Sequence, residues 1–334
     1  MAATDSSPDP GLDLVTRLPR RMQLDERWMI RRPRGFTWWG HTLAQRVWLD
    51  AVEDYHGTPI ARLHVETDVL RGVPDEAAAI AALVPLNRAA SLSSLAVDAD
   101  GRIRLHASIA VTPDNATLAG SLAQHALAIQ AADAHIKAAP LAAHLGAQVA
   151  RSAHPSHGPR AEPDDLLDAI AFYADKGAGP SPFADVDFRA VALMQPRPWV
   201  LARTTGDGLE AELPFLGSKP SILDGTGAAA PETALLQVQT SVRHAQLGAG
   251  LLLRLALPVR TGVGVANQLN LAETVRPEGH QLGAWTIDQQ NLACYTFVPA
   301  VAFAEGLVET LIWHVAARAL WARGQVFPAT PPAR

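Results

Sequence analysis

Apolar and polar residues alternate along two stretches near the amino terminus, residues 36–49 and 59–70. In the second stretch Arg62, His64 and Glu66 occupy one face, and mainly apolar side chains occupy the other. Alternation of this kind is typical of a β-strand with one buried face, because successive side chains point to opposite sides. The two stretches therefore predict an antiparallel hairpin with one apolar and one polar face.

A helical spacing of apolar residues occurs in residues 117–139 and 303–321, and it predicts two long helices. Each helix follows a short helix and a hairpin, so the same order of elements occurs twice along the chain. Asp98 and Asp288 lie at the turns of these hairpins, where Asp is favoured because its side chain hydrogen-bonds to nearby backbone. The repeat predicts an α+β fold of two tandem units, each an antiparallel sheet flanked by helices.

The boundary between the units is predicted in a segment rich in Pro and Gly, residues 146–182, which we interpret as a linker. Residues 31–145 then form the first unit, and residues 183–334 form the second. Residues 1–30 are polar, rich in arginine and interrupted by proline, so we expect a mobile amino-terminal arm. A chain of 334 residues, 48% of them hydrophobic, can bury a core in each unit.

The composition bears on where the protein works. Its single cysteine, Cys294, excludes an internal disulfide and a thiolate zinc site, and it is typical of a reducing cytoplasm. No apolar run reaches the roughly 18 residues that a membrane span needs, and the amino terminus lacks the apolar core of a signal peptide. Abundant Ala and Arg with scarce Lys are typical of a GC-rich bacterial genome. We therefore expect a bacterial cytoplasmic protein that has no membrane contact.

The sequence gives no positive case for catalysis. Its twelve histidines lack carboxylates or thiolates at ligand spacing, and no Gly-x-Ser-x-Gly sequence is present. The sequence Thr261-Gly-Val-Gly-Val-Ala-Asn267 follows an apolar strand and opens a helix, as a dinucleotide-binding loop does, but Asn267 replaces the third glycine. The strands around it have the pattern of antiparallel hairpins, not of βαβ units. We predict a non-enzymatic protein without catalytic residues, cofactors or metal ions; a nucleotide-binding enzyme that uses the glycine turn at residues 262–267 is an alternative.

Arginine and aromatic residues are concentrated in residues 17–48. Basic side chains interleaved with aromatic rings can bind phosphates and stack on bases, so a nucleic-acid-associated protein is a second alternative, which the net charge of -5 disfavours. Trp38 and Trp39 are adjacent in a predicted strand, so one ring must meet solvent, another domain or a partner. We expect this hairpin to contact another protein. The candidate contact residues are Phe36, Trp38, Trp39, Trp48, Arg31, Arg32 and Arg34.

The repeated unit has a recognisable arrangement: a short helix ending in Leu-Asn, a hairpin with a Val/Ile-Asp turn, and a long closing helix. Ala266-Asn-Gln-Leu-Asn270, Leu282-Gly-Ala-Trp-Thr-Ile-Asp288, residues 292–297 and the helix from Phe303 carry it in the second half. The first half repeats it more loosely, beginning with Leu86-Asn-Arg88. This arrangement resembles YbjN-like proteins, bacterial sensory-transduction regulators that share the α/β fold of type III secretion chaperones.

The resemblance implies a non-enzymatic adaptor or chaperone-like regulator that presents a sheet face or groove to a segment of another protein. It also implies a homodimer. Members of this family usually contain a single unit, so the tandem copy is a departure, and the Trp-rich hairpin and the arginine arm lie outside the family pattern. The sequence leaves open whether the chain dimerises or whether its two halves already form an internal pseudo-dimer.

Overall fold

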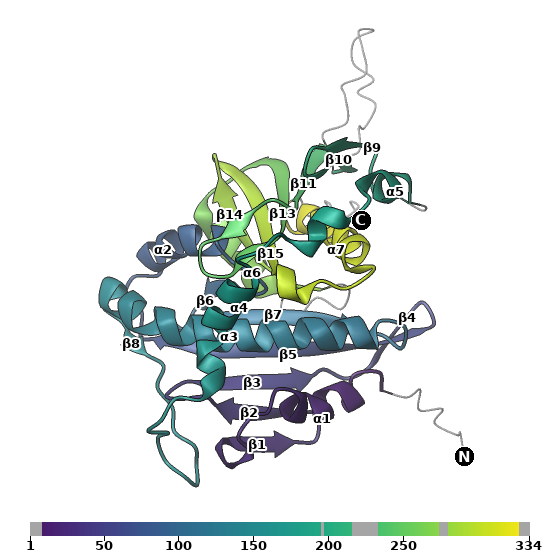
Figure 1. Ribbon diagram of the computed structural model, residues 1–334. Helices are drawn as coiled ribbons and strands as arrows, with labels where there is room; N and C mark the ends of the chain where they lie inside the picture. Colours follow the sequence, from purple (N-terminus) through teal and green to yellow (C-terminus); the bar gives the residue numbers. More distant parts are fainter. Residues whose placement is uncertain (1–8, 195–196, 216–232, 274–279, 327–334) are drawn as a thin grey trace, which may run out of the picture.

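Two antiparallel sheets with helices packed against them make up the described part of the chain (Figure 1). The computed structural model describes residues 9–194, 197–215, 233–273 and 280–326. The predicted α+β fold class, with two tandem sheet units, is confirmed. No helix within these ranges combines the length and the apolar character that crossing a bilayer requires.

Sheet 1 belongs to the first half of the chain. The elements of this half are α1 (Leu12–Arg21), β1 (Met29–Arg32), β2 (Gly35–Trp39), β3 (Ala44–Leu49), β4 (Glu53–Tyr55), β5 (Thr58–Arg71), α2 (Glu76–Arg88), β6 (Ser94–Val97), β7 (Ile103–Val111), α3 (Ala116–Leu145) and β8 (Gln148–Val149). The strands lie in the order β1-β2-β3-β5-β7-β6, and the short strands β4 and β8 pair with β5. Helix α3 runs across β5 and β7 on one face of the sheet (Figure 1).

Sheet 2 belongs to the second half and repeats this arrangement. The elements of this half are α5 (Phe188–Leu193), β9 (Leu201–Thr205), β10 (Gly208–Pro214), β11 (Thr233–Gln239), β12 (Arg243–His244), β13 (Gly248–Arg260), α6 (Val263–Ala272), β14 (Ala284–Asp288), β15 (Asn291–Pro299) and α7 (Leu307–Val326). The strands lie in the order β9-β10-β11-β13-β15-β14, so each position in the main path of sheet 1 has a counterpart. The Trp-rich hairpin β2–β3 therefore corresponds to β10–β11, and the duplication is more complete than the sequence indicates.

The alternation of side chains along β5 decides which face of sheet 1 is buried. Leu63 and Val65 are fully buried in the hydrophobic core, whereas His64 and Glu66 lie on the opposite face. The predicted antiparallel pairing, with one apolar and one polar face, is present between β3 and β5. Residues 36–49, however, form two paired strands, β2 and β3, where the alternation predicted one. Helix α3 packs on the apolar face through many alanines, because small side chains allow a helix to approach a sheet closely.

Part of the amino-terminal segment is an ordered helix. Leu14, Val15 and Leu18 lie on one side of α1 and are buried, and α1 contacts α3 and β3. Apolar residues at this spacing give a helix one face to bury. This differs from the mobile arm that we expected for residues 1–30; residues 1–8 lie outside the described residues.

Residues 146–182, which we expected to be a linker, pack between the two units. They contain β8, a 3₁₀ turn at Asp165–Asp168, and α4 (Ala169–Lys176). Helix α4 contacts both α3 of the first half and β13 of the second. Leu167 and Tyr173 are buried in the core that the two halves share. This segment therefore forms part of the packed structure and is more than a connection.

The two units contact each other reciprocally. Helix α2 packs on β14, helix α6 packs on β6, and the two helices also meet. The side chain of Asn267 on α6 accepts a hydrogen bond from the backbone N–H of Val97 at 3.0 Å and donates one to its carbonyl at 2.9 Å. In the other direction, Thr286 Oγ1 on β14 donates to the carbonyl of Val84 on α2 at 3.0 Å. One hydrophobic cluster includes residues of both sheets, so the halves have the arrangement of an internal pseudo-dimer.

Candidate functional site

A cleft of about 670 Å³ lies between the polar face of sheet 1 and helix α6. We call it the histidine cleft. The residues that line it are Arg46, Trp48, Asp50, His64, Glu66, Ser94, Ala96, Arg104, His106, Asn270 and Leu271. Most of them come from the first unit, and only Asn270 and Leu271 come from the second. The cleft therefore depends on the packing of the two units against each other.

A hydrogen-bonded chain of Asp50, His64 and His106 crosses the floor of the cleft. Oδ2 of Asp50 lies 2.7 Å from Nε2 of His64, and Nδ1 of His64 lies 3.1 Å from Nε2 of His106. Trp48 is opposite His64 in the β3–β5 register, and the two rings stack with centroids 4.7 Å apart. The chain begins at Asp50, whose side chain is 49% exposed, and ends at the buried His106.

The two ends of this chain differ electrostatically. The hydrogen bond with His64 lowers the pKa of Asp50, and the positive charges of His64 and Arg62 add to this effect, against the opposing cost of burial. Burial lowers the pKa of His106 well below the usual value of an imidazole, and charge on His64 and Arg62 acts in the same direction. At neutral pH Asp50 is therefore a carboxylate and His106 is a neutral imidazole.

Glu66 is a buried carboxylate held between two arginines. Its Oε1 accepts a hydrogen bond from Nη2 of Arg46 at 2.5 Å, and its Oε2 accepts one from Nη1 of Arg104 at 3.2 Å. Arg46 also pairs with Asp68, and Arg104 also pairs with Asp98. Each guanidinium group is thus shared by two carboxylates, which fixes its orientation along the cleft.

Ser94 Oγ, a buried polar atom of the cleft, has no hydrogen-bond partner among the described residues. The His106 imidazole, whose Nε2 faces His64, also interacts with the side chain of Gln281, which does not line the cleft. Ser94 and His106 lie opposite each other in the β6–β7 register, and they are only 1% and 5% exposed. A buried polar atom without a partner is costly, and in most proteins such an atom bonds to ordered water or to a ligand. The cleft therefore has unused hydrogen-bonding capacity.

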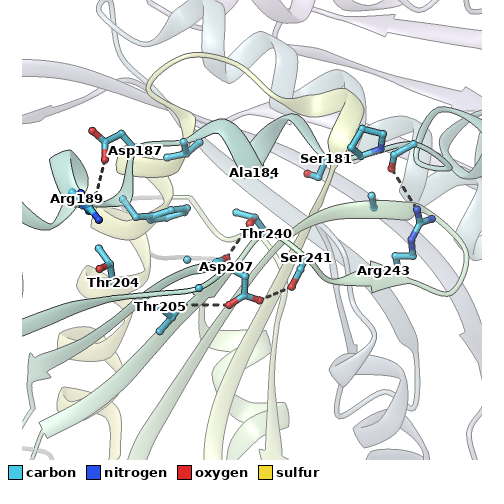
Figure 2. Close-up of a pocket in the computed structure, with 17 residues that line it drawn as sticks. Ser181, Ala184, Asp187, Arg189, Thr204, Thr205, Asp207, Thr240, Ser241 and Arg243 are labelled. Atoms are coloured by element: carbon cyan, nitrogen blue, oxygen red, sulfur yellow. Dashed lines mark hydrogen bonds between the residues drawn. The ribbon is translucent and has the colours of Figure 1, made fainter.

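Figure 2 shows a second pocket, of about 570 Å³, in the second unit. Asp207 at its centre accepts hydrogen bonds from Thr205 Oγ1 and Ser241 Oγ, and Arg243 donates to the carbonyls of Gly177 and Ala178. None of the described side-chain atoms of this pocket is buried without a partner. Asp207 and Arg243 therefore hold the walls of this pocket together, and the histidine cleft, which contains a buried hydroxyl without a partner, is the stronger candidate for a ligand site.

The residues that we predicted to contact a partner do not form one exposed surface. Phe36 and Trp38 lie in the hydrophobic core. Trp39 faces the other way, but the segment after α3 covers it: its indole N–H donates to Ser152 Oγ at 2.8 Å, and its ring meets that of His154 edge-on. One of the two tryptophans does need a contact outside the hairpin, and the chain itself provides that contact.

The other predicted contact residues are dispersed. Trp48 is half-buried and lines the histidine cleft. Arg31 and Arg32 are exposed on the edge strand β1, and Arg31 and Arg34 each form an ion pair with an acidic residue. The tryptophan rings of this segment are buried or half-buried, so the exposed arginines and the rings do not form one surface.

The predicted glycine turn at residues 262–267 lies at the start of α6, which follows β13: Gly262 is the N-cap and residues 263–267 belong to the helix. Strand β13 pairs antiparallel with both β11 and β15, so the turn does not belong to a βαβ unit of a dinucleotide-binding fold. Its last residue, Asn267, forms the contact with Val97 that joins the units. The position that departs from the glycine pattern therefore has a structural role.

The ionisable groups in and near the cleft bear on metal binding and on nucleophilic chemistry. Over the ranges that the structure covers, no group of three or more His, Cys, Asp or Glu side chains is placed to hold a metal ion. Burial raises the pKa of Cys294 to about 12, so its thiol is a poor nucleophile in the folded protein. Asp50 and His64 orient His106 much as a relay orients a base, and the imidazole of His106 also interacts with the amide side chain of Gln281.

Sequence reasoning missed the histidine cleft, although it placed His64 and Glu66 on the polar face of their strand. The missed signal lies in β7, the strand that pairs with β5. Arg104 and His106 are two residues apart in β7, so they point to the same face of the sheet as their partners Asp68 and Glu66. Two paired strands that both direct ionisable residues to one face indicate a polar site and not only a solvated surface.

The fold and the cleft define a duplicated α+β protein with a polar cleft between its two units. No family model, curated protein or solved structure matches the chain. The resemblance to YbjN-like proteins therefore stays a prediction from the sequence, and the function is inferred from the surfaces and the cleft.

Proposed function

We propose that the protein is a non-enzymatic adaptor of the bacterial cytoplasm, which binds an extended segment of another protein at the outer edge of β9, with which no described strand pairs. The proposal keeps the protein-binding role that the YbjN-like resemblance implies. It moves the contact surface from the Trp-rich hairpin to the second unit. The observation that carries it is a group of exposed apolar side chains beside an open sheet edge.

Side chains close the inner edges of both sheets. At β6, the amide of Asn87 hydrogen-bonds to the backbone N–H and carbonyl of Leu95, and the amide of Asn267 does the same at Val97. At β14, Asn270 forms the equivalent pair of hydrogen bonds. Backbone groups that are bonded in this way cannot accept a further strand.

The outer edges of the sheets are open to different degrees. Strand β1 has four residues, two of them the exposed Arg31 and Arg32, and charges of this kind protect an edge. Strand β9 pairs with β10, and no described residue pairs with its other side. Leu193, Val200 and Leu201 are 76%, 56% and 56% exposed, the highest values among the large apolar residues described. An open edge beside such a patch fits strand addition, in which backbone hydrogen bonds and apolar side-chain contacts act together.

The register of the β9–β10 hairpin identifies the backbone groups that a partner would use. A two-residue turn places Thr205 opposite Gly208, and Arg203 lies two positions further along the ladder. In a hairpin with a two-residue turn, the backbone N–H groups of Thr205 and Arg203 hydrogen-bond to β10. The N–H groups of the alternate residues, Ala202 and Thr204, therefore point away from β10.

Fluorescence polarisation with extended peptides, selected against the protein from a display library, tests the proposal. We expect Thr204→Pro to weaken binding by about tenfold or more, because it removes an outward N–H while leaving the bonds to β10. Thr204→Val keeps the N–H and the strand propensity, so it should bind like the wild type. Leu201→Asp should also weaken binding, because it places a charge in the apolar patch. Equal affinities of the folded Pro and Val variants would exclude the β9 edge as the contact surface.

A second copy of the chain can occupy the same edge, which would give the homodimer that the resemblance implies. Light scattering of the wild type and Thr204→Pro distinguishes the two occupants. A wild-type mass of two chains that falls to one chain in the variant would assign the edge to self-association. A wild-type mass of one chain would refute the homodimer and leave the edge to a different protein.

A further inference from the structure

The histidine cleft lies outside the β9 surface, and the proposed adaptor function leaves it unused. We propose that this cleft binds a saccharide through a pyranose ring. The balance of charges, the unpaired hydroxyl of the buried Ser94, the aromatic wall and the volume of the cleft all point to this class of ligand.

The charges of the residues that line the cleft cancel. Arg46 and Arg104 are balanced by Asp50 and Glu66, and both arginines pair with Glu66. Each arginine also pairs with a carboxylate beside the cleft, Asp68 or Asp98. An anionic ligand would meet these carboxylates, and a cationic ligand would meet the two guanidinium groups. A neutral ligand rich in hydrogen-bonding groups can use both donors and acceptors without adding net charge.

The unpaired hydroxyl of Ser94 can both donate and accept a hydrogen bond. A sugar hydroxyl has both capacities on one atom, so it can pair with Ser94 Oγ in either role. Ser94 lines the cleft and lies opposite His106 on the neighbouring strand, so a hydroxyl of a ring that packs beside Trp48 can reach it.

The aromatic wall provides a surface for the apolar side of a sugar. The indole of Trp48 stacks on His64 at an interplanar angle of 10° and lies 6.4 Å from the ring of His106. The residue opposite Trp48 on β2 is Gly35, which has no side chain to cover the indole from that side. The C–H face of a pyranose packs well against such a ring. The cleft volume of about 670 Å³ lies within the range of roughly 300–1,000 Å³ that small-molecule sites occupy.

Calorimetry and saturation-transfer NMR with glucose, galactose, mannose and N-acetylglucosamine test the inference. We expect the wild type to bind at least one of these sugars. Ser94→Ala removes the unpaired hydroxyl with little change in volume, and it should weaken binding by about tenfold. Trp48→Ala should remove detectable binding. Trp313→Ala, on the exposed face of α7, is the matched control and should bind like the wild type.

Inorganic phosphate and methylammonium serve as anionic and cationic probes. Sugar binding that Ser94→Ala and Trp48→Ala leave unchanged, in variants that melt at the wild-type temperature, would overturn the inference. So would a wild type that binds no sugar, or one that binds either ion more tightly than every sugar. The Thr204→Pro variant should retain its sugar affinity, so failure of the β9 proposal and failure of this one are distinguishable.

Discussion

Replacing Asn267 by alanine tests the contact that joins the two units. Its amide makes two hydrogen bonds to the backbone of Val97, at 3.0 Å and 2.9 Å, and both residues are buried. Alanine removes both partners and leaves an N–H and a carbonyl of β6 without hydrogen bonds in the interior. These backbone groups have no other route to a partner, because they lie on the edge of β6 that the second unit covers.

The expected cost of Asn267→Ala follows from these two contacts. Each buried hydrogen bond contributes about 1 kcal/mol net, and each buried group left unpaired costs about 1–3 kcal/mol. We therefore expect the free energy of unfolding to fall by about 2–5 kcal/mol, a large part of the roughly 5–15 kcal/mol that stabilises a typical domain.

Urea unfolding and amide hydrogen exchange together test this expectation. Asn87→Ala is the matched control, because its amide makes the same two hydrogen bonds to Leu95, at 2.9 Å each, within the first unit. Both variants should be destabilised, but only Asn267→Ala should speed exchange at Val97 and along α6. A loss below about 1 kcal/mol, with exchange at Val97 unchanged, would refute the inter-unit clamp.

Three further predictions concern buried groups. Arg318 and Glu273 form a bidentate ion pair at 2.8 and 2.7 Å with both side chains 1% exposed. Arg318→Leu should therefore cost about 3–5 kcal/mol in urea unfolding, and adding Glu273→Leu should recover part of that loss; a double variant no more stable than the single one would contradict this. Burial lowers the pKa of His106 and His280 well below 6.5. As the pH falls below about 6.5, the unfolded chain binds protons that the folded chain does not, so the free energy of unfolding should fall by up to about 1.4 kcal/mol per pH unit for each histidine. Urea titrations at about pH 7 and pH 5.5 measure how steeply the free energy of unfolding depends on pH. The same dependence in the His106→Gln/His280→Gln variant would show that these two histidines do not cause it. Cys294 is buried, and burial raises its pKa to about 12, so it should react with iodoacetamide only after unfolding, as mass spectrometry can show.

Local pattern was enough to predict the sheets. The alternation of Leu63 and Val65 with His64 and Glu66 records which face of β5 is buried, because the side-chain period of a strand is fixed. The sequence did not predict helix α1, because the row of apolar residues on its buried side is short and Pro19 lies within the helix. Contact with α3 and β3 stabilises that helix, and such a contact is absent from local sequence.

Long-range packing explains what the sequence did not reveal about the site. The pair Trp38-Trp39 shows that a second ring needs a cover, but it does not show that His154 provides that cover. The histidine cleft has the same origin, since one of its walls includes Asn270 and Leu271 of the other unit. A single sequence records the polar side chains of such a site but not the packing that encloses them.

The repeated aspartates show how far the two units have diverged. Asn87 hydrogen-bonds to the backbone of Leu95, and Asn270 forms the same two bonds with Trp285, so Leu95 and Trp285 are equivalent positions of the two units. Asp98 and Asp288 follow these positions by the same number of residues. Asp98 accepts hydrogen bonds from two backbone N–H groups of its own turn, as predicted for a turn former, and one from the side chain of Arg104. Asp288 accepts hydrogen bonds from the side chains of Arg254 and Tyr295, across the polar face of sheet 2.

The same alignment predicts a single saccharide site in each chain. It places His106 of the cleft at the position of Tyr295, and Glu66 at the position of Arg254. In the second unit Arg254 and Tyr295 both donate to Asp288, at 2.6 and 2.7 Å, so the polar face is closed by its own hydrogen bonds. The alignment also places Ser94, with its unpaired hydroxyl, at the position of Ala284, which has no hydroxyl. Calorimetry should therefore find one sugar bound per chain, and two equivalent sites would show that the unpaired hydroxyl is not what selects the ligand.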